Sequence, residues 1–352
     1  MDTLASLLHL APATFWMLAK VLIAFGVIMA IAPPLTWAER RGSAMLQDRI
    51  GPNRAALFGK FKIIGLAHAL ADGIKFFFKE DLVPPHANKF LFWLAPLLAF
   101  VPAMLGFAVI PLGRSFHADG TLYHLSLLDP GNGMGMLFPM AVGAMAIYGV
   151  MVAAWSSNNK WSILGGMRAS AQMVSYEIGL SLAVLAIFMK VGGYDPAQII
   201  AEQAHGWFFW RQPLGFLVFF TCMFAETNRL PFDFAEGESE IVAGFHVEYG
   251  SMKFGLMGLA EYGHIMGASA LITTLYFGGW RIPFMAGDQM AVPVLVTVAV
   301  FMAKMLFFCW VFIWIRWTLP RFRYDQLMHL GWKRLLPISM ANLLIYAYQM
   351  RA

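Results

Sequence analysis

The sequence is short of charge and of cysteine. Only 13% of its 352 residues are charged, about half of the usage in typical soluble domains, and 59% are hydrophobic. This composition excludes a soluble globular enzyme. The two cysteines, Cys222 and Cys309, lie in apolar surroundings without CxxC spacing, which argues against a disulfide framework, an iron–sulfur cluster or a thiolate zinc site. We therefore expect no redox metal in this chain.

The beginning of the chain lacks the basic stretch and the cleavage site of a signal peptide. Asp2 is the only charged residue before Lys20, so we expect the first apolar segment to remain as a transmembrane helix. The net charge of +5 comes mostly from Lys and Arg in short loops between apolar stretches, where such residues set membrane orientation. Nucleic acid is therefore not an expected partner.

Long apolar stretches recur from end to end, close to the roughly 20 residues that span a bilayer as a helix. In lipid such segments must satisfy their own backbone hydrogen bonds, which predicts helices rather than a barrel. The predicted fold is an all-α polytopic membrane protein, one domain over residues 1–352. About eight spans are predicted: Phe15–Thr36, Phe90–Gly113, Met134–Ser157, Ala169–Met189, Trp207–Ala225, Phe254–Trp280, Ala291–Ile315 and Leu335–Met350.

The basic residues between these spans are distributed unequally. One side of the predicted membrane holds eighteen Lys and Arg and the other holds five. The positive-inside rule places the richer side in the cytoplasm or the mitochondrial matrix, so both termini should face outward. The expected location is the bacterial inner membrane, or the mitochondrial inner membrane in a eukaryote.

The long first cytoplasmic loop, residues 37–89, contains a second kind of helix. Between Leu57 and Lys79 apolar residues recur at helical spacing opposite a polar stripe that includes Asp72. This pattern predicts an amphipathic helix at the membrane surface. It serves either as a simple interfacial anchor or as a portal for a lipid-soluble substrate, and the composition does not separate the two.

A second cytoplasmic loop, residues 226–253, is acidic. From Glu226 to Glu261 the chain holds seven acids and two bases, a net charge of −5, while the rest of the chain sums to +10. Glu236 and Glu240 should share a helix face, and crowding should raise the pKa of some of these carboxyl groups, which favours proton exchange near neutrality. The alternative is a solvated loop that binds a basic partner. Interleaved apolar residues favour partial burial: Pro231, Phe232, Phe234, Ile241, Val242 and Phe245.

Charged residues also occur inside the predicted spans. Glu177 and Glu261 lie in the fourth and sixth spans, and Lys304 lies near the middle of the seventh. Charges at such depth are costly and usually serve transport. With Glu226 at the inner end of the fifth span, they would form a chain of titratable sites leading into the membrane. A structural Lys–Glu pair is the alternative.

Several long motifs resemble one family. AETNRLPFDFAEGESEIVAGFHVEYG at 225–250 is the strongest, supported by RIGPN at 49–53, LADGIKFFFKE at 70–80, MRASAQMVSYE at 167–177 and PRFRYDQLMHLGWK at 320–333. Together they resemble the H subunit of NADH-quinone oxidoreductase, respiratory complex I, the counterpart of mitochondrial NADH dehydrogenase subunit 1. Between Asn53 and Ala71 the chain reads RAALFGKFKIIGLAHAL, longer and more basic than the usual turn of that family.

The resemblance implies a membrane-arm subunit that forms the quinone entrance and couples quinone reduction to proton pumping. It implies no cofactor in this chain, with FMN and iron–sulfur clusters in partner subunits and antiporter-like membrane subunits beside it. The implied quinone-channel residues are Glu39, Arg40, Arg49, Asp72, Arg229, Phe232 and Asp233. The acidic path implied by the resemblance, to which the analysis of the buried charges adds Lys304, comprises Glu177, Glu226, Glu236, Glu238, Glu240, Glu248, Glu261 and Lys304.

Two functions from other classes remain open on the sequence. A cation-coupled transporter would use Glu177, Glu261 and Lys304 as its site and would move ions by itself. A membrane anchor of a soluble oxidoreductase, including a ferredoxin- or hydrogenase-linked complex, would need the buried acids for assembly alone. The quinone and the electron donor are not named by the residues.

Overall fold

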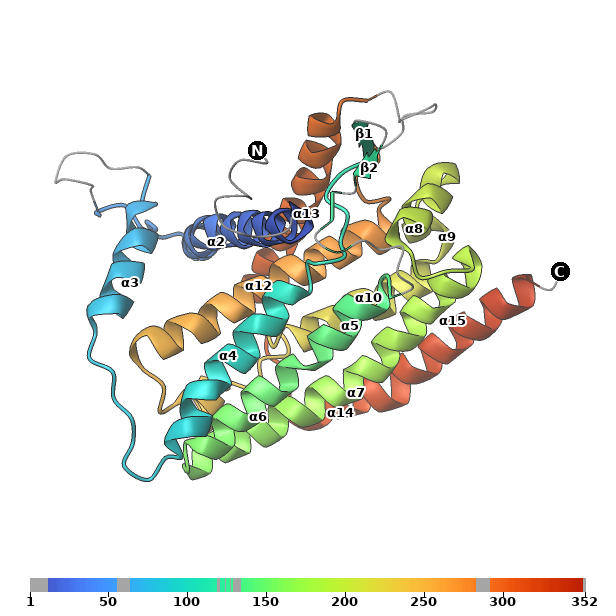
Figure 1. Ribbon diagram of the computed structural model, residues 1–352. Helices are drawn as coiled ribbons and strands as arrows, with labels where there is room; N and C mark the ends of the chain where they lie inside the picture. Colours follow the sequence, from blue (N-terminus) through green and yellow to red (C-terminus); the bar gives the residue numbers. More distant parts are fainter. Residues whose placement is uncertain are drawn as a thin grey trace.

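A computed structural model describes residues 12–55, 64–118, 121–123, 125, 126, 128, 134–282 and 292–350. Within these ranges the chain is almost wholly helical (Figure 1). The longer helices are α2 (Pro12–Leu46), α3 (Ala67–Phe78), α4 (Lys89–Leu105), α6 (Ala146–Ser156), α7 (Lys160–Val191), α10 (Pro213–Glu226), α12 (Ser251–Tyr276), α13 (Val294–Thr318) and α15 (Leu336–Gln349). The expectation of a helical membrane fold is confirmed.

Shorter elements connect them. These are α5 (Leu137–Ala144), α8 (Pro196–Glu202), α9 (Phe208–Arg211), α11 (Glu238–Ile241), α14 (Tyr324–Leu330), the 3-10 turns η2 (Gln203–His205) and η3 (Gly244–His246), and the π-turn η5 (Gly331–Leu335). Two strands, β1 (Phe116–Ala118) and β2 (Thr121–Tyr123), pair antiparallel. The all-α prediction missed this hairpin because its strands are only three residues long.

Four helical segments are long and apolar enough to cross a membrane: Lys20–Leu46, Leu137–Ser156, Lys160–Val191 and Val294–Thr318. Two shorter apolar helices, Lys89–Leu105 and Pro213–Glu226, fall below that length. Every predicted span overlaps a helix, and the number of eight membrane crossings stays a prediction. The first helix runs ten residues past the predicted end at Thr36, to Leu46, so the first cytoplasmic loop begins as helix.

Local signals explain several helix boundaries. The side chain of Asn88 accepts a hydrogen bond from the amide of Leu91 at the start of α4, and Asn159 does the same for Trp161 at the start of α7. Helix α7 ends at Gly192, whose φ of 76° places it in the left-handed conformation that glycine tolerates. These residues stop and start the chain between the predicted spans.

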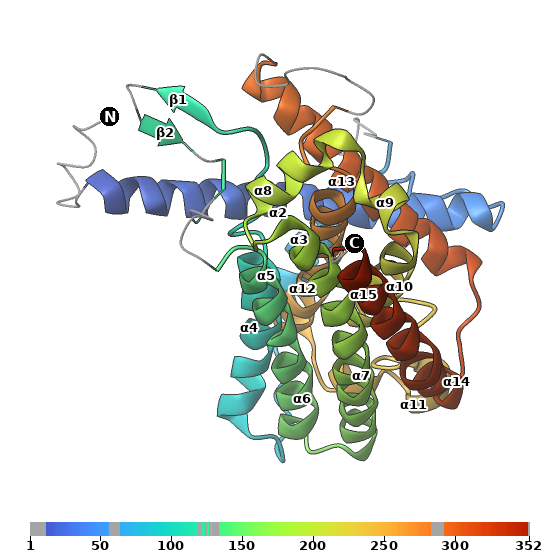
Figure 2. The same cartoon turned by 90° about the vertical axis from the view of Figure 1, so that its right-hand side faces the viewer.

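Helix α7 lies at the centre of the bundle and packs against α6, α10 and α15, while α12 packs against α4 and α13. Small residues allow close approach: a Cβ added at Gly149 of α6 would lie 2.6 Å from the backbone nitrogen of Ala99 in α4. Helix α2 crosses this bundle instead of running along it (Figure 2). Its apolar side chains are largely exposed, as Leu22 (68%) and Ile23 (67%) show, which suits a lipid-facing helix.

Helix α3 occupies the place of the predicted amphipathic helix. Apolar side chains on it, including Leu70, Ile74, Phe77 and Phe78, are all more than half exposed, and α3 contacts α2 and α12. Residues 57–63 of the predicted helix lie outside the described residues. An exposed apolar face fits a membrane surface, and the interfacial position stays a prediction.

Candidate functional site

Buried Arg229 joins two helices and the acidic loop. Its guanidinium lies 3.4 Å from Oε1 of Glu39 on α2 and 3.0 Å from Oε2 of Glu261 on α12, and it stacks over the ring of Tyr262 at 5.1 Å. Burial opposes the charge on Arg229, but Glu261 and Glu39 raise its pKa above the ordinary value. Arg229 therefore remains a fixed positive charge inside the protein.

Glu39 is the second hub of this cluster. It is only 6% exposed, and it accepts a hydrogen bond of 2.5 Å from the hydroxyl of Tyr262 and a contact from the guanidinium of Arg316. Two arginines and a tyrosine thus hold one carboxylate at the meeting point of α2, α12 and α13. Glu39 lies on the part of α2 that continues past the predicted span, so the extra helical turns position it.

Glu236 and Glu261 form a carboxyl pair beside Arg229. Their side chains are hydrogen bonded to each other, which requires one of the two carboxyl groups to carry a proton. Burial raises the pKa of Glu236, and Asp233 and Glu238 raise it further, against the opposing effects of Glu261 and Arg229. The pair can therefore hold and release a proton next to a fixed positive charge.

The local backbone separates Glu236 from Glu240. Helix α11 begins only at Glu238, and Gly237 before it has a φ of 38°. The prediction that Glu236 and Glu240 share a helix face is therefore wrong: Glu236 points inward to Glu261, whereas Glu240 forms an ion pair of 2.5 Å with Arg168 of α7. A helical periodicity cannot apply across a left-handed glycine.

His246 of η3 lies next to this pair, with Nδ1 at 3.8 Å from Oε1 of Glu236. Burial lowers the pKa of His246, while Glu261 and Glu238 act in the opposite direction. The imidazole is therefore mainly neutral near pH 7 and can accept a proton from the pair. Across the described ranges, no three His, Cys, Asp or Glu side chains gather as metal ligands.

Asp233 forms a second buried ion pair. Its Oδ2 lies 2.7 Å from Nη2 of Arg321, while its Oδ1 is buried without a hydrogen-bond partner among the described residues. Burial raises the pKa of Asp233, against the opposing charge of Arg321. Phe232, the preceding residue, stacks on Phe322 with ring centroids 5.6 Å apart. The acidic loop is thus fastened to the segment after α13.

The apolar residues of the loop explain its position. Pro231, Phe232, Phe234, Ile241 and Phe245 are buried, as predicted, whereas Val242 is 57% exposed. Their burial brings the carboxylates inside, which a purely solvated acidic loop would not do. The loop therefore belongs to the core of the protein.

The remaining quinone-channel candidates lie nearer the surface. Arg40 forms an ion pair of 2.6 Å with Asp72 of α3, which also contacts Lys75 at 3.3 Å. Arg49 is exposed and donates to Gln47 at 2.7 Å. Arg40 and Asp72 thus connect α2 to α3, one residue from Glu39, whereas Arg49 is not brought into the buried cluster.

Glu226 lies at the end of α10 between two small cavities. One, of about 40 Å³, is lined by Glu226, Gly143, Gly263 and His264, and the other, of about 10 Å³, lies between Glu226 and Glu177. A water molecule needs at least about 10–15 Å³. The first cavity therefore has room for water, and the second is at the limit for a single one.

The other predicted acids are spread over the surface of the loop and its surroundings. Glu238 is exposed, and Glu248 accepts a hydrogen bond of 2.7 Å from Asn159. Lys304 lies elsewhere, because its ammonium donates to the carbonyl oxygens of Phe277 (2.7 Å), Gly279 (2.9 Å) and Arg281 (2.7 Å). These three carbonyls stabilise the turn after α12, and they give Lys304 a structural role distinct from the acidic cluster.

Sequence reasoning missed Arg316, Arg321 and Tyr262 as members of the cluster. Arg316 and Arg321 entered it only as cytoplasmic positive charges. A usable signal existed, since Arg316 is the basic residue in the last turn of the long apolar helix α13 and Arg321 belongs to the motif at 320–333. Tyr262 follows Glu261 directly, but nothing in the sequence brings it to Glu39.

We expect Glu236→Gln to change how stability depends on pH. A carboxyl group whose pKa is higher in the folded than in the unfolded protein makes the fold less stable as pH rises from the ordinary value of 4.5 through the raised pKa. The melting temperature of the unmodified protein should therefore fall relative to that of Glu236→Gln across this range. Thermal unfolding in detergent at stepped pH measures this.

The matched control for that experiment is Glu238→Gln, which removes an exposed carboxylate two residues away. Its melting temperature should follow the unmodified protein at every pH. A constant difference between Glu236→Gln and the unmodified protein over the whole range would show that Glu236 does not retain a proton on folding.

Comparison with known proteins agrees with the motifs. The family model described as NADH dehydrogenase matches residues 18–347. A first H subunit of NADH-quinone oxidoreductase from Cytophaga hutchinsonii is 46% identical over 327 residues, covering 91% of this chain and 92% of the relative. The corresponding H subunit from Bdellovibrio bacteriovorus is 40% identical, covering 94% of both chains. A first H subunit from Geobacter sulfurreducens is 42% identical, covering 94% of this chain and 93% of the relative.

The match covers the acidic loop, the helices around it and the segment that carries Arg316 and Arg321. Identity above 40% over nine tenths of both chains is far beyond what unrelated sequences share. The chain therefore belongs to the NADH dehydrogenase family, as a membrane protein of the same type as the H subunits of NADH-quinone oxidoreductase, respiratory complex I.

Proposed function

We propose that this chain forms the quinone entrance of a proton-pumping NADH-quinone oxidoreductase and couples quinone reduction to proton movement in the bacterial inner membrane. The observation that carries the proposal is the buried cluster of Arg229, Glu39, Glu236 and Glu261, in which two carboxyl groups share a hydrogen bond beside a fixed guanidinium. Electrons would come from the FMN and iron–sulfur clusters of partner subunits.

The quinone entrance is proposed between α2, α3 and the acidic loop. Arg40 and Asp72 connect α2 to α3, and the neighbouring Glu39 belongs to the buried cluster. The exposed apolar face of α3 offers a lipid-soluble molecule a surface beside this ion pair. Phe232 and Asp233 lie on the inner side of the same loop, where an aromatic ring and a buried carboxylate suit a quinone head group.

The proposed coupling is electrostatic. A charge that appears on the quinone during reduction changes the balance between Arg229 and its carboxylates, because interactions between buried charges are poorly screened. The hydrogen-bonded pair of Glu236 and Glu261 responds by taking up or releasing a proton, as a coupled pair does. Glu226 and Glu177, with room for water beside Glu226, continue the route into the membrane.

The outer members of the acidic set have supporting roles in this proposal. Glu240 holds α11 against α7 through Arg168, and Glu248 is held by Asn159 at the start of α7. Exposed Glu238 adds negative charge next to Glu236. Lys304 is not part of the proposed route, because it is engaged by the carbonyl groups after α12.

The test is Glu177→Gln in membrane vesicles. NADH oxidation by a quinone is compared with NADH oxidation by a water-soluble acceptor that does not need the membrane arm. We expect the quinone activity to fall by about tenfold or more, as for loss of a proton-transferring group, with the water-soluble activity intact. Loss of both activities would instead support a membrane anchor needed for assembly, and loss of neither would remove Glu177 from the route.

A further inference from the structure

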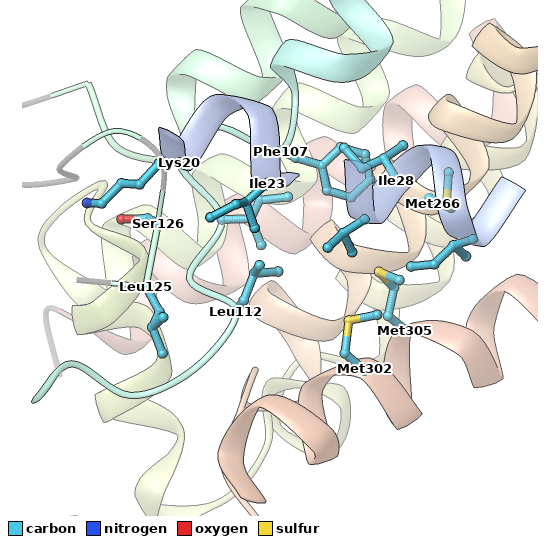
Figure 3. A pocket seen from close by; sticks show the side chains of 13 residues that line it. Lys20, Ile23, Ile28, Phe107, Leu112, Leu125, Ser126, Met266, Met302 and Met305 are labelled. Atoms are coloured by element: carbon cyan, nitrogen blue, oxygen red, sulfur yellow. The ribbon is translucent and has the colours of Figure 1, made fainter. Parts of the chain in front are cut away.

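A second hollow lies far from the acidic cluster. It has a volume of about 230 Å³ and is formed by α2, α12, α13 and the segments after α4 and β2, with Ile28, Phe107, Met266, Met302 and Met305 among its walls (Figure 3). Lys20 and Glu39 are nineteen residues apart on the continuous helix α2, or ~28 Å at 1.5 Å per residue. This hollow and the proposed quinone entrance therefore lie toward opposite ends of α2.

The walls of the hollow are almost entirely aliphatic, aromatic or methionine side chains. Water does not fill an apolar cavity, and an empty one loses the van der Waals contacts of its lining. Ile23 at its rim is 67% exposed, so the hollow opens toward the lipid-facing side of α2. A hydrocarbon chain from the membrane can enter it.

One end of the hollow is polar. Half-buried Lys20 lies there together with Ser126, away from Met302 and Met305 (Figure 3). Ser126 is only 7% exposed, and its hydroxyl has no hydrogen-bond partner in the described part of the chain. An unsatisfied buried hydroxyl costs free energy unless a ligand supplies the partner. A positive charge and a free donor at the mouth of an apolar hollow together suit an anion that carries a hydrocarbon chain.

We propose that this hollow binds one acyl chain of an anionic phospholipid, with the lipid phosphate beside Lys20 and Ser126. The volume is below the ~300–1,000 Å³ of typical small-molecule sites, so it admits part of a chain and excludes a ring system. A quinone tail would leave Lys20 and Ser126 without a partner. This proposal does not depend on the proposed coupling function.

The test uses the full chain in vesicles of phosphatidylcholine that contain a small fraction of photoactivatable phosphatidylglycerol with the reactive group on its acyl chain. After illumination, peptide mass spectrometry should locate the label on the α2 and α13 segments that line the hollow. Lys20→Gln should lower this labelling about fivefold, the effect of one basic residue on an anionic lipid, and should leave labelling by photoactivatable phosphatidylcholine unchanged.

Two further variants make the result specific. Lys190→Gln removes a lysine from the same predicted side of the membrane, at the end of α7, and should leave the labelling unchanged. Met302→Trp, which fills the hollow, should lower labelling of these segments by both lipids. Equal labelling in Lys20→Gln and the unmodified chain, or displacement of the lipid by an added quinone, would overturn the proposal.

Discussion

Arg229→Met is expected to remove quinone-linked NADH oxidation almost completely. The substitution leaves Glu39 and Glu261 buried without their shared guanidinium, at a cost of about 3–5 kcal/mol for a broken buried ion pair. Because proteins are only marginally stable, part of the loss will come from a lower amount of assembled protein. The measurement is quinone-linked activity in vesicles, normalised to the amount of this chain in the membrane.

A double variant separates stability from function. In Arg229→Met with Glu261→Gln one of the two stranded carboxylates is gone, so the amount of assembled protein should recover while the quinone-linked activity stays low. Arg211→Met is the control, because Arg211 pairs with Glu202 at 3.4 Å near the other end of the bundle. Full activity in the double variant would show that the charge cluster only stabilises the fold.

Glu226→Gln is expected to give the second largest loss, a fall of about tenfold or more in coupled quinone reduction. Glutamine keeps the size and the hydrogen-bonding groups of Glu226 but cannot exchange a proton. Glu226 lies between the water-sized cavity next to His264 and the smaller cavity next to Glu177, so its loss would interrupt the route between them. The measurement is proton uptake by vesicles during quinone reduction, with NADH oxidation by a water-soluble acceptor as the assembly control.

A variant that keeps the carboxyl group should imitate this loss. A Cβ added at Gly143 would lie 2.8 Å from Oε1 of Glu226, so Gly143→Ala should displace the carboxyl group from the cavity. We expect a smaller fall in proton uptake than in Glu226→Gln. Glu202→Gln, which changes a carboxylate on α8, should have the normal rate. Normal pumping in both Glu226→Gln and Gly143→Ala would exclude Glu226 from the route.

The membrane class and the candidate acids were predictable from the sequence. Apolar length and scarce charge require helices in lipid, and this argument needs no knowledge of packing. The buried position of the acidic loop was also predictable, since Phe232, Phe234 and Phe245 alternate with its carboxylates. The long motifs indicated the family, which the comparisons then confirmed.

Contacts between distant segments were not predictable. Arg316 lies 277 positions after Glu39, and Tyr262 lies 223 positions after it, yet both contact the same carboxylate. Periodicity describes which face of one helix is apolar, but it does not say which helices cross. The left-handed Gly237 also defeated the expected helix face of Glu236 and Glu240, because one backbone conformation redirects every side chain after it.

Residue chemistry along the chain thus determined the solvent of this protein, its helices and its supply of buried acids. The tertiary structure alone decided which acid meets which base. It joined Glu39, Arg229, Glu236 and Glu261 into one cluster and assigned Lys304 to a turn of carbonyl groups instead. The physical reason is that charge interactions depend on distance and burial, and both are set by how α2, α12 and α13 cross.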